Sequence, residues 1–253
     1  MLKPQVAAAR CTLAAGVDAL PGGFALLTAS RTLVCADVHF GYEDVIAGGG
    51  ALPLWSTAES ASAIAVAAQR YGAREIVILG DAIHASRMSS AAASAVRGAL
   101  DALRAIAVLT IVAGNHEGRS RGAAILGETV EACDRDGWRL VHGDKAHIGE
   151  TPAMIGHLHP SLGVGGGATV PAFLGAQRLV VLPAVTPYSA GLDVTGADCA
   201  AALGAWGVER AAVHVVAVTA ERVFPFGSLS RLAGLSAAAA SRAGRRRVLR
   251  PDR

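Results

Sequence analysis

The sequence predicts an α/β fold in which parallel strands carry helices on the faces of a sheet. In the first half of the chain, three short apolar runs alternate with two stretches of helical pattern, which is the order of β-α-β units. Such units bury both faces of their strands, and these runs are almost wholly apolar. The 253 residues are 52% hydrophobic but only 4% aromatic. They suffice for one sizeable domain whose core is mostly Ala, Val and Leu.

The elements of this first half have recognisable ends. The predicted strands are, in order, Arg31–Ala36, Glu75–Leu79 and Ala107–Ala113. The first helix begins at a capping box in Ser56–Glu59 and ends near Tyr71, where Gly72 follows. The second helix is predicted over Ser89–Ala105, an Ala-rich stretch that tolerates Gly98.

The second half of the chain carries further apolar runs with short links and little helical pattern. The predicted strands here are Trp138–Val141, Ala153–Ile155, Leu179–Leu182, Ala211–Val218 and Arg222–Phe224. Short links without helices do not favour parallel crossovers. This half therefore predicts a second sheet of more mixed character.

Composition excludes several classes of protein. The longest uncharged run, Thr151–Gln177, is interrupted by prolines and glycines, so no transmembrane helix and no membrane association are expected. The N-terminus lacks the compact apolar segment of a signal peptide, which predicts a cytoplasmic protein. The four cysteines are far apart and form no C-x-x-C motif. We therefore expect free thiols rather than disulfides or a cysteine zinc site.

Charge is concentrated at the C-terminus. Residues 236–253 hold six arginines and one aspartate, a net charge of +5, and since the whole chain carries +3, residues 1–235 carry −2. We expect a single domain over residues 1–235 followed by a basic, disordered tail over residues 236–253. The tail is either a solvated terminus or an electrostatic arm for nucleic acid. No aromatic residue lies among its arginines, so base stacking is not indicated there.

Residues that can bind metals follow five consecutive predicted strands. They are Asp37 and His39, then Asp81, then Asn115 with His116 and Glu117, then His142 with Asp144, and finally His157 and His159. In open α/β sheets, ligands bind beyond the carboxyl ends of the strands. Six of the eight histidines lie at or near these ends, at positions 39, 84, 116, 142, 157 and 159. We therefore expect a ligand site at this edge.

His157 and His159 stand two positions apart at the end of an apolar run. Alternate residues of a strand point to the same face. Two imidazoles fill a core poorly, because each has a donor and an acceptor that need partners. For this motif alone, two solvated histidines at a surface strand end are the alternative, but the other strand ends favour a metal site.

The order D-x-H, G-D, G-N-H-E, H and G-H-x-H resembles the calcineurin-like metallophosphoesterase superfamily, over residues 37–159. The segments Arg178–Asp193 and Val223–Leu229, together with "ADVHFGYE", resemble its compact subgroup of archaeal predicted phosphoesterases and bacterial ligase-associated metallophosphoesterases. The resemblance implies an αββα sandwich of two mixed sheets flanked by helices. It also implies hydrolysis of phosphate esters and a functional association with a DNA ligase or helicase.

This resemblance further implies a centre of two divalent metal ions. The implied ligands are Asp37, His39, Asp81 and His159 for the first ion and Asp81, Asn115, His142 and His157 for the second. Asp81 bridges the ions, which a carboxylate can do and a neutral imidazole cannot. Nitrogen and oxygen ligands without thiolate suit Mn²⁺, the ion we expect, and also Fe, Zn²⁺ or Co²⁺. Two such ions can share a hydroxide that attacks phosphorus in line.

Other residues near these motifs are candidates for contact with the substrate. The resemblance assigns to His116 the stabilisation or protonation of the leaving group. Glu117 either orients His116 as a second catalytic residue or is a structural carboxylate. His84 could line the pocket or lie in the first turn of the next helix. Arg119 could bind a substrate phosphate or be a solvated loop arginine.

Three more residues have a less specific signal. Asp144 could orient His142 through the second ring nitrogen, as metal-bound histidines usually require, or be a turn residue. Tyr42 and Glu43 follow the first motif closely, and either could touch the substrate.

The function expected from these features is a metal-dependent phosphoesterase that hydrolyses phosphodiesters, with a nuclease as one concrete version. A phosphomonoesterase is the alternative, because the specificity of such a site lies in the walls around it. The third possible function is that of a non-catalytic scaffold with the same fold. The complete set of candidate metal ligands, together with His116, disfavours it.

Overall fold

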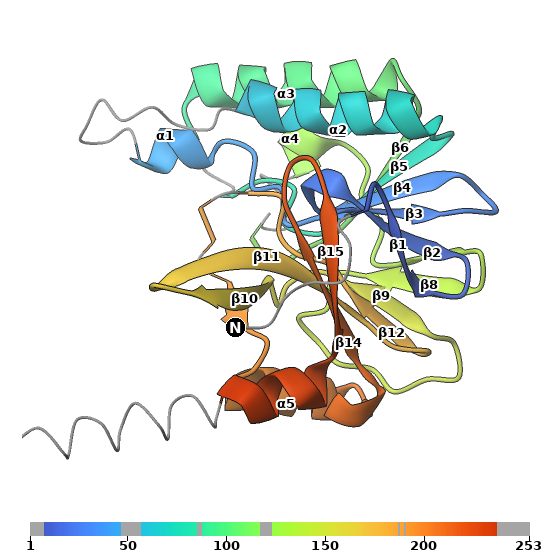
Figure 1. Ribbon diagram of the computed structural model, residues 1–253. Helices are drawn as coiled ribbons and strands as arrows, with labels where there is room; N and C mark the ends of the chain where they lie inside the picture. Colours follow the sequence, from blue (N-terminus) through green and yellow to red (C-terminus); the bar gives the residue numbers. More distant parts are fainter. Residues whose placement is uncertain are drawn as a thin grey trace, which may run out of the picture.

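Two β-sheets lie face to face in the computed structural model of this protein, with helices against the outer face of each sheet (Figure 1). The structure describes residues 8–46, 57–84, 88–116, 123–186, 188–189 and 191–236. The arrangement of two mixed sheets flanked by helices confirms the predicted fold class. None of the helices within these ranges is long and apolar enough to span a membrane.

The first sheet has six strands, and neighbours in this sheet are also neighbours in the sequence. They are β1 (Cys11–Ala14), β2 (Val17–Leu20), β3 (Phe24–Leu27), β4 (Thr32–Ala36), β5 (Glu75–Leu79) and β6 (Val108–Val112). Strands β4 to β6 are parallel and match the three predicted strands to within one residue at each end. Strands β1 to β3 were not predicted, because each has only four residues and gives little periodic signal. They pair antiparallel and make the sheet mixed.

Two long helices cover the outer face of the first sheet, as Figure 1 shows. They are α2 (Thr57–Tyr71) and α3 (Ser90–Arg104). The alternation of side chains along β4 explains how one strand serves two layers. Leu33 and Cys35 pack toward the helices, whereas Val34 and Ala36 pack toward the second sheet. An apolar run without polar alternation is what a strand buried on both faces requires.

Polar side chains fix where the two long helices begin. Ser89 caps α3, since its Oγ accepts a hydrogen bond from the backbone N–H of Ala92 at 3.1 Å. At the start of α2, the carboxylate of Glu43 accepts from the backbone N–H of Thr57 at 2.8 Å and from its hydroxyl at 2.6 Å. Ser56 of the predicted capping box lies outside the described residues.

The second sheet has nine strands. They are β7 (Cys133–Arg135), β8 (Trp138–Val141), β9 (Ala153–Ile155), β10 (Pro160–Gly165), β11 (Ala168–Gly175), β12 (Leu179–Val181), β13 (Leu192–Asp193), β14 (His214–Val218) and β15 (Val223–Ser228). Strands β8 and β9 have the predicted bounds, and β12 ends one residue early. Strand β14 starts later than predicted because Arg210–Ala212 forms a 3₁₀ helix. The sequence patterns did not indicate β7, β10, β11 and β13.

One helix in the second half of the chain was not predicted, because the helical pattern there is weak. Helix α5 (Ala197–Ala205) packs Cys199 and Leu203 against the second sheet. It is short, and its N-cap residue Gly196 offers no side-chain cap, so the usual start signal is missing. Two shorter helices, α1 (Tyr42–Ile46) and α4 (Ala123–Leu126), complete the set of helices with bounds in the described ranges.

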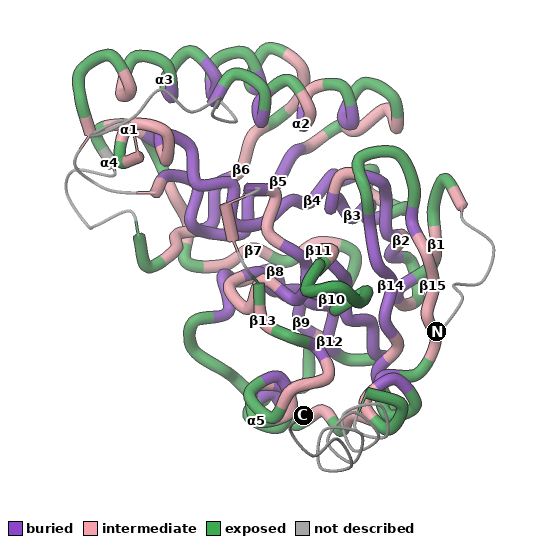
Figure 2. Tube along the Cα trace, turned by 60° about the vertical axis from the view of Figure 1, so that its left-hand side comes forward, coloured by how far each residue is buried: buried purple, intermediate pink, exposed green. Residues whose placement is uncertain are grey.

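The apolar core has three layers, and Figure 2 shows the buried residues concentrated along the strands of both sheets. Ile64 and Leu100 fill the layer between the long helices and the first sheet. Met154 and Phe173 lie between the sheets. Trp206 belongs to the layer under α5. Because the inter-sheet layer is dry and apolar, the polar strand ends gather at its edge.

The described part of the chain ends in a helical stretch over residues 229–236. Leu229 and Leu232 from this stretch are buried in the layer under α5. Residues 237–253, which contain the six arginines of the predicted tail, lie outside the described residues. The boundary after residue 235 stays a prediction.

A partly buried ion pair ties the two sheets together. Glu75, at the start of β5, accepts two hydrogen bonds of 2.7 Å from the guanidinium of Arg135 on β7. The same carboxylate accepts from the hydroxyl of Thr110 on β6 at 2.7 Å. Burial alone would raise the pKa of Glu75, but these hydrogen bonds and the charge of Arg135 outweigh it and lower the pKa.

We expect Glu75→Gln to lower the free energy of unfolding by about 1–3 kcal/mol at pH 7, because it leaves Arg135 without its charged partner. A carboxylate whose pKa is lowered by folding stabilises the protein above its unfolded pKa, and this contribution is lost as the pH falls through the folded pKa. Urea denaturation should therefore find that the difference in stability between wild type and variant shrinks as the pH falls below the ordinary pKa of a glutamate.

The control is Asp101→Asn, which removes an exposed pair with Arg104 and should change stability by less than about 0.5 kcal/mol. Equal effects of the two substitutions at pH 7 would show that the pair between Glu75 and Arg135 does not hold the sheets together.

Candidate metal centre

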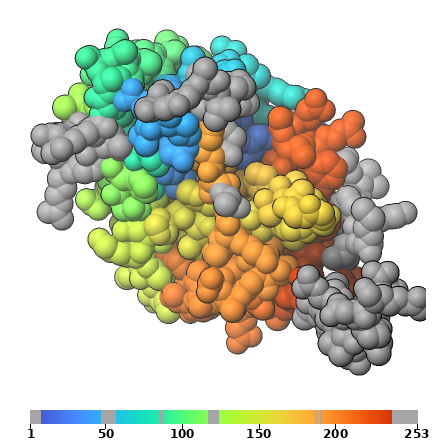
Figure 3. All heavy atoms as spheres, turned by 90° about the vertical axis from the view of Figure 1, so that its left-hand side faces the viewer, coloured from blue at the N-terminus to red at the C-terminus, as the bar shows by residue number. Residues whose placement is uncertain are grey.

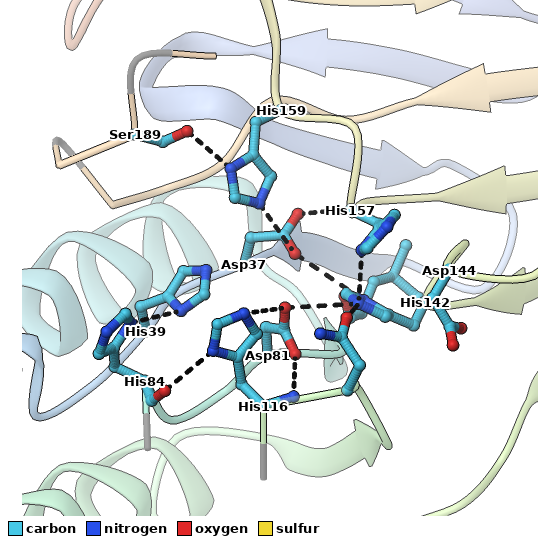
Figure 4. A network of polar contacts seen from close by, with 12 residues as sticks. Asp37, His39, Asp81, His84, His116, His142, Asp144, His157, His159 and Ser189 are labelled. Atoms are coloured by element: carbon cyan, nitrogen blue, oxygen red, sulfur yellow. Dashed lines mark hydrogen bonds and ion pairs between the residues drawn. The ribbon is translucent and has the colours of Figure 1, made fainter. Parts of the chain in front are cut away.

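The polar residues that follow five strands meet at one edge of the sandwich, as Figure 4 shows. Residues after β4, β5 and β6 come from the first sheet, and residues after β8 and β9 come from the second. The predicted ligands in this cluster are Asp37, His39, Asp81, Asn115, His142, His157 and His159. All seven lie in the described ranges, and the structure brings their side chains together at this edge.

One group of donor atoms surrounds Nε2 of His142. This nitrogen lies 2.8 Å from Oδ1 of Asn115, 3.1 Å from Nδ1 of His157 and 3.4 Å from Oδ2 of Asp81. These four residues are the set that the resemblance implies for the second ion. Nitrogen and oxygen atoms at such separations could bind one divalent cation among them.

The other ring nitrogen of His142 shows how the imidazole is oriented. Nδ1 lies 3.3 Å from the backbone carbonyl oxygen of Leu79, to which it can donate, and this leaves Nε2 for the donor group. Metal-binding histidines are commonly oriented by such a contact. Asp144 was considered for this task, but the structure assigns it to the backbone of Leu79.

A second group consists of Asp37, His39 and His159, whose candidate ligand atoms all lie within 4.8 Å of one another. Nε2 of His159 is 3.3 Å from Oδ1 of Asp37, and its Nδ1 is 2.7 Å from the hydroxyl of Ser189. When Nδ1–H donates to Ser189, the lone pair on Nε2 faces the carboxylate. Two electron-pair donors that face each other at this distance are suited to a cation between them.

Asp37 provides the most direct indication that a cation fits here. Its side chain is 0% exposed, and Oδ2 accepts a hydrogen bond from the backbone N–H of His157 at 2.8 Å. Oδ1 is buried as well, and it has no hydrogen-bond donor among the described residues. A buried carboxylate oxygen without a donor costs free energy unless a positive charge is placed beside it. The two donor groups therefore fit a pair of divalent ions.

The backbone at this edge adopts conformations that side-chain-bearing residues rarely take. Among the described residues, seven other than glycine have a positive φ, and five of them are predicted ligands. These five are Asp37 (52°), His39 (52°), Asp81 (44°), His157 (60°) and His159 (45°). Residues are held in this left-handed region only when the surroundings enforce it, and such residues cluster at functional sites.

Two glycines let the strand ends approach one another closely. A Cβ atom on Gly156 would lie 2.6 Å from Oδ2 of Asp37 and 2.7 Å from the Cβ of Ala36. A Cβ atom on Gly80 would overlap the ring of His142, and the φ of Gly80 is +69°. Glycine is thus required at both positions by contact with the site.

His116 lies at the open side of the cluster, with 40% of its side chain exposed. Its backbone N–H donates to Oδ1 of Asp81 at 2.9 Å, and its Nδ1 is 3.0 Å from the carbonyl oxygen of His84. His84 also has its Nδ1 3.3 Å from Nδ1 of His39. His84 therefore lies against the cluster rather than apart from it. Glu117 and Arg119 lie outside the described residues.

The charges and burial of the cluster's own side chains favour a proton on one histidine. Burial lowers the pKa of His39 to about 4 and also lowers the pKa of His157. Burial opposes ionisation of Asp81, but the hydrogen bond and charge of His142 prevail and lower its pKa to about 2. Burial likewise disfavours the charged form of His142, yet Asp81 and Asp37 raise its pKa to about 9. A proton on His142 thus partly fills the role of a cation.

A groove of about 940 Å³ opens beside Asn115 and His142. Its walls include Arg139 of β8, Asp144 and Trp206. The segments between β6 and β7 and after β8 supply most of the remaining lining. The centre is thus flanked by space that could take part of a substrate.

Comparison with known proteins establishes the fold. No protein-family model and no curated protein matches this chain. The solved structure of a Pseudomonas putida nuclease, MPE, is similar, with a TM-score of 0.61 and 23% identity over 83% of this chain and 94% of that chain. An E. coli phosphoesterase, Yfce, has a TM-score of 0.38 and 16% identity over 64% of this chain and 83% of that chain, too low a score to indicate a shared fold. At these identities, the chemistry has to be argued from the site.

Metal binding should release one proton and should strengthen as the pH rises. A histidine ligand must be neutral, so an ion has to displace the proton that His142 carries below its pKa of about 9. We expect the association constant for Mn²⁺ to rise about tenfold per pH unit between about pH 6.5 and 8.5. Isothermal titration calorimetry in buffers of different ionisation enthalpy should find about one proton released per chain.

The control is His147→Gln, which changes an exposed histidine outside the two donor groups and should leave the released proton unchanged. Binding that is independent of pH and releases no proton would contradict the assignment of His142 as a protonated ligand.

Proposed function

We propose that this protein is a metal-dependent phosphoesterase that hydrolyses phosphodiesters. The observation that carries the proposal is the pair of donor groups around Asp37 and Asp81, each made of carboxylate and imidazole ligands and joined at one edge of the sandwich. Similarity in fold to a nuclease supports the same class of reaction.

Each donor group would hold one ion. Asp37, His39 and His159 would bind the first ion, Asn115, His142 and His157 would bind the second, and Asp81 would bridge them. When bound, Mn²⁺ or a similar divalent ion supplies charge for the phosphate oxygens and activates a water molecule for in-line attack. Fe, Zn²⁺ and Co²⁺ suit the same ligands.

His116 is the residue we propose for proton transfer. Its backbone is fixed by Asp81 and its Nδ1 is oriented by the carbonyl of His84, so Nε2 is the nitrogen left for the substrate. Nε2 lies 3.8 Å from Oδ2 of Asp81, beside the donor groups but outside them. Because Nδ1–H donates to that carbonyl oxygen, a second proton on Nε2 makes the ring an imidazolium, which could donate to the leaving oxygen and stabilise charge on the phosphoryl group.

The space around the centre favours diesters over monoesters. A diester carries groups on both sides of phosphorus, and the groove beside Asn115 and His142 supplies room for one of them. The side of the centre next to His84 and His116 is partly exposed, and the other group could extend there. A phosphomonoesterase is the second candidate, because the same ions and His116 could serve it equally well.

A panel of three substrates tests the class of ester. With Mn²⁺ supplied, we expect kcat/KM for bis(p-nitrophenyl) phosphate to exceed that for p-nitrophenyl phosphate, because the site has room for two ester groups. DNA is the third substrate and tests the nuclease version. Asp81→Asn, which removes the bridging charge, should abolish all turnover. The opposite ranking would favour the phosphomonoesterase, and no turnover of any ester would refute the proposed function.

Substitution of His116 separates catalysis from metal binding. His116→Gln should lower kcat by roughly 10²–10⁴ while the metal content of the protein stays near that of wild type. The matched substitution His142→Gln should lose metal, since Nε2 of His142 is central to one donor group. Elemental analysis and steady-state kinetics measure both effects. Equal loss of metal in the two variants would mean that His116 is a ligand and not the proton donor.

A further inference from the structure

A chain of aromatic rings leads away from the metal centre on the side of His116. The ring centroids of His116 and His84 are 5.4 Å apart, those of His84 and Tyr42 are 4.1 Å apart, and those of Tyr42 and Tyr188 are 4.7 Å apart. His84 joins this chain to the ligand His39, at 5.3 Å between centroids. The two tyrosines therefore lie next to the centre.

The two tyrosines come from distant parts of the chain. Tyr42 begins α1, and Tyr188 follows β12 by several residues. Figure 3 shows the face of the molecule on which α1, in blue, lies beside the orange segment that follows β12. Ser189, the neighbour of Tyr188, is the residue that contacts Nδ1 of His159. The segment with Tyr188 is thus fixed to the metal centre.

Filling of the core does not account for this pair. The core is built mainly from Ala, Val, Leu and Ile, and only three tyrosines occur in the whole chain. No residue of α1 is buried, and both Tyr42 and Tyr188 are partly exposed. Two of the three tyrosines therefore stand beside the proposed active site and are partly exposed.

We propose that Tyr42 and Tyr188 form a stacking platform for the nucleobase of the nucleotide that adjoins the scissile phosphate. This proposal rests on the proposed phosphodiesterase function and adds the class of substrate, a nucleotide ester. The two ring planes are inclined by 48° to each other, so each ring offers a face of its own, and any base can stack on an accessible aromatic face. His84 sets the spacing between the platform and the proton donor His116, since its ring contacts one and its carbonyl oxygen contacts the other.

The position of the platform agrees with the charges around the centre. The groove on the opposite flank is lined by four acidic residues and two basic ones: Glu131, Asp134, Asp144 and Glu150 against Arg139 and Lys145. Arg139 and Lys145 are paired with Asp134 and Asp144, at 2.9 Å and 4.0 Å. The acidic excess that remains disfavours further phosphates of a polyanion. The aromatic flank is therefore the better side for a base, which is uncharged and apolar on its faces.

Dinucleoside monophosphates test the platform because each contains one phosphodiester. The substrates are thymidylyl-thymidine and two analogues. Each analogue lacks one of the two bases, and a hydrogen atom takes the place of that base on the deoxyribose. For the Mn²⁺-loaded wild type, we expect kcat/KM of the parent to exceed that of one of the analogues by roughly 5- to 100-fold. The loss should fall mainly on KM, because stacking binds the ground state and the transition state alike.

Three variants make the test specific. Tyr42→Ala and Tyr188→Ala should bring the ratio between parent and analogue towards one, whereas Tyr188→Phe should keep it. Tyr71→Ala is the matched control. Tyr71 ends α2, where its ring lies under Arg70 at 5.7 Å, and its loss should leave the ratio unchanged. The ratio is taken within each protein, so a change in stability or in metal content does not alter it.

The outcomes separate the two proposals. If the wild type cleaves the parent and both analogues equally, or if both alanine variants keep the wild-type ratio, the platform is refuted while the phosphodiesterase stands. If the wild type cleaves bis(p-nitrophenyl) phosphate but none of the dinucleotides, a nucleotide substrate is refuted. If it cleaves no diester at all, the proposed function fails and the platform fails with it.

Discussion

The buried carboxylate of Asp37 is the constraint on which the candidate site depends. It follows β4 of the first sheet, yet Oδ2 accepts its hydrogen bond from the backbone of His157, which follows β9 of the second sheet. A second hydrogen bond joins the sheets beside Asp37. The backbone N–H of Val185, which follows β12 of the second sheet, donates to the carbonyl oxygen of Ala36, the last residue of β4, at 3.0 Å. Both sheets are therefore positioned around one negative charge that is removed from water.

This arrangement is costly without a cation. Burial of a carboxylate with one oxygen lacking a donor is unfavourable, and left-handed backbone at five neighbouring residues adds about 1–3 kcal/mol each. The dry layer between the sheets, with Met154 and Phe173, supplies the packing that holds these conformations in place. Ions that bind only the folded chain would offset the cost, so metal binding and folding stability should be coupled.

Predictions from the sequence were most accurate where an apolar strand is followed closely by residues that can bind a metal. Runs such as Glu75–Leu79 are apolar on both faces after the first residue and are followed closely by a polar residue, here Asp81, so both the bounds of the strand and the site residue could be predicted. The short strands β1 to β3 and the helix α5 were missed, because strands of four residues give little periodic signal and the helix has no side-chain cap to mark its start. The four-layer arrangement itself came from the resemblance of the motifs to a known superfamily.

Partners of the ligand side chains were harder to predict than the ligands. A backbone carbonyl carries no sequence signal, so the contact of His142 with Leu79 could not be found, and Asp144 was considered in its place. Ser189 lies 30 residues from His159 along the chain, and only the folded structure brings them together. The assignment of ions to particular ligands, with Asp81 between them, stays a prediction, and so do the roles of Glu117 and Arg119.

The central claim is that two ions bind in the two donor groups at the junction of the sheets. Anomalous diffraction from crystals soaked in Mn²⁺ tests it directly. The account predicts two peaks, about 3.5–4 Å apart, one next to Asp37 and His159 and the other next to Asn115 and His142. A single peak among His39, His84 and His116, or no peak at this edge of the sandwich, would contradict it.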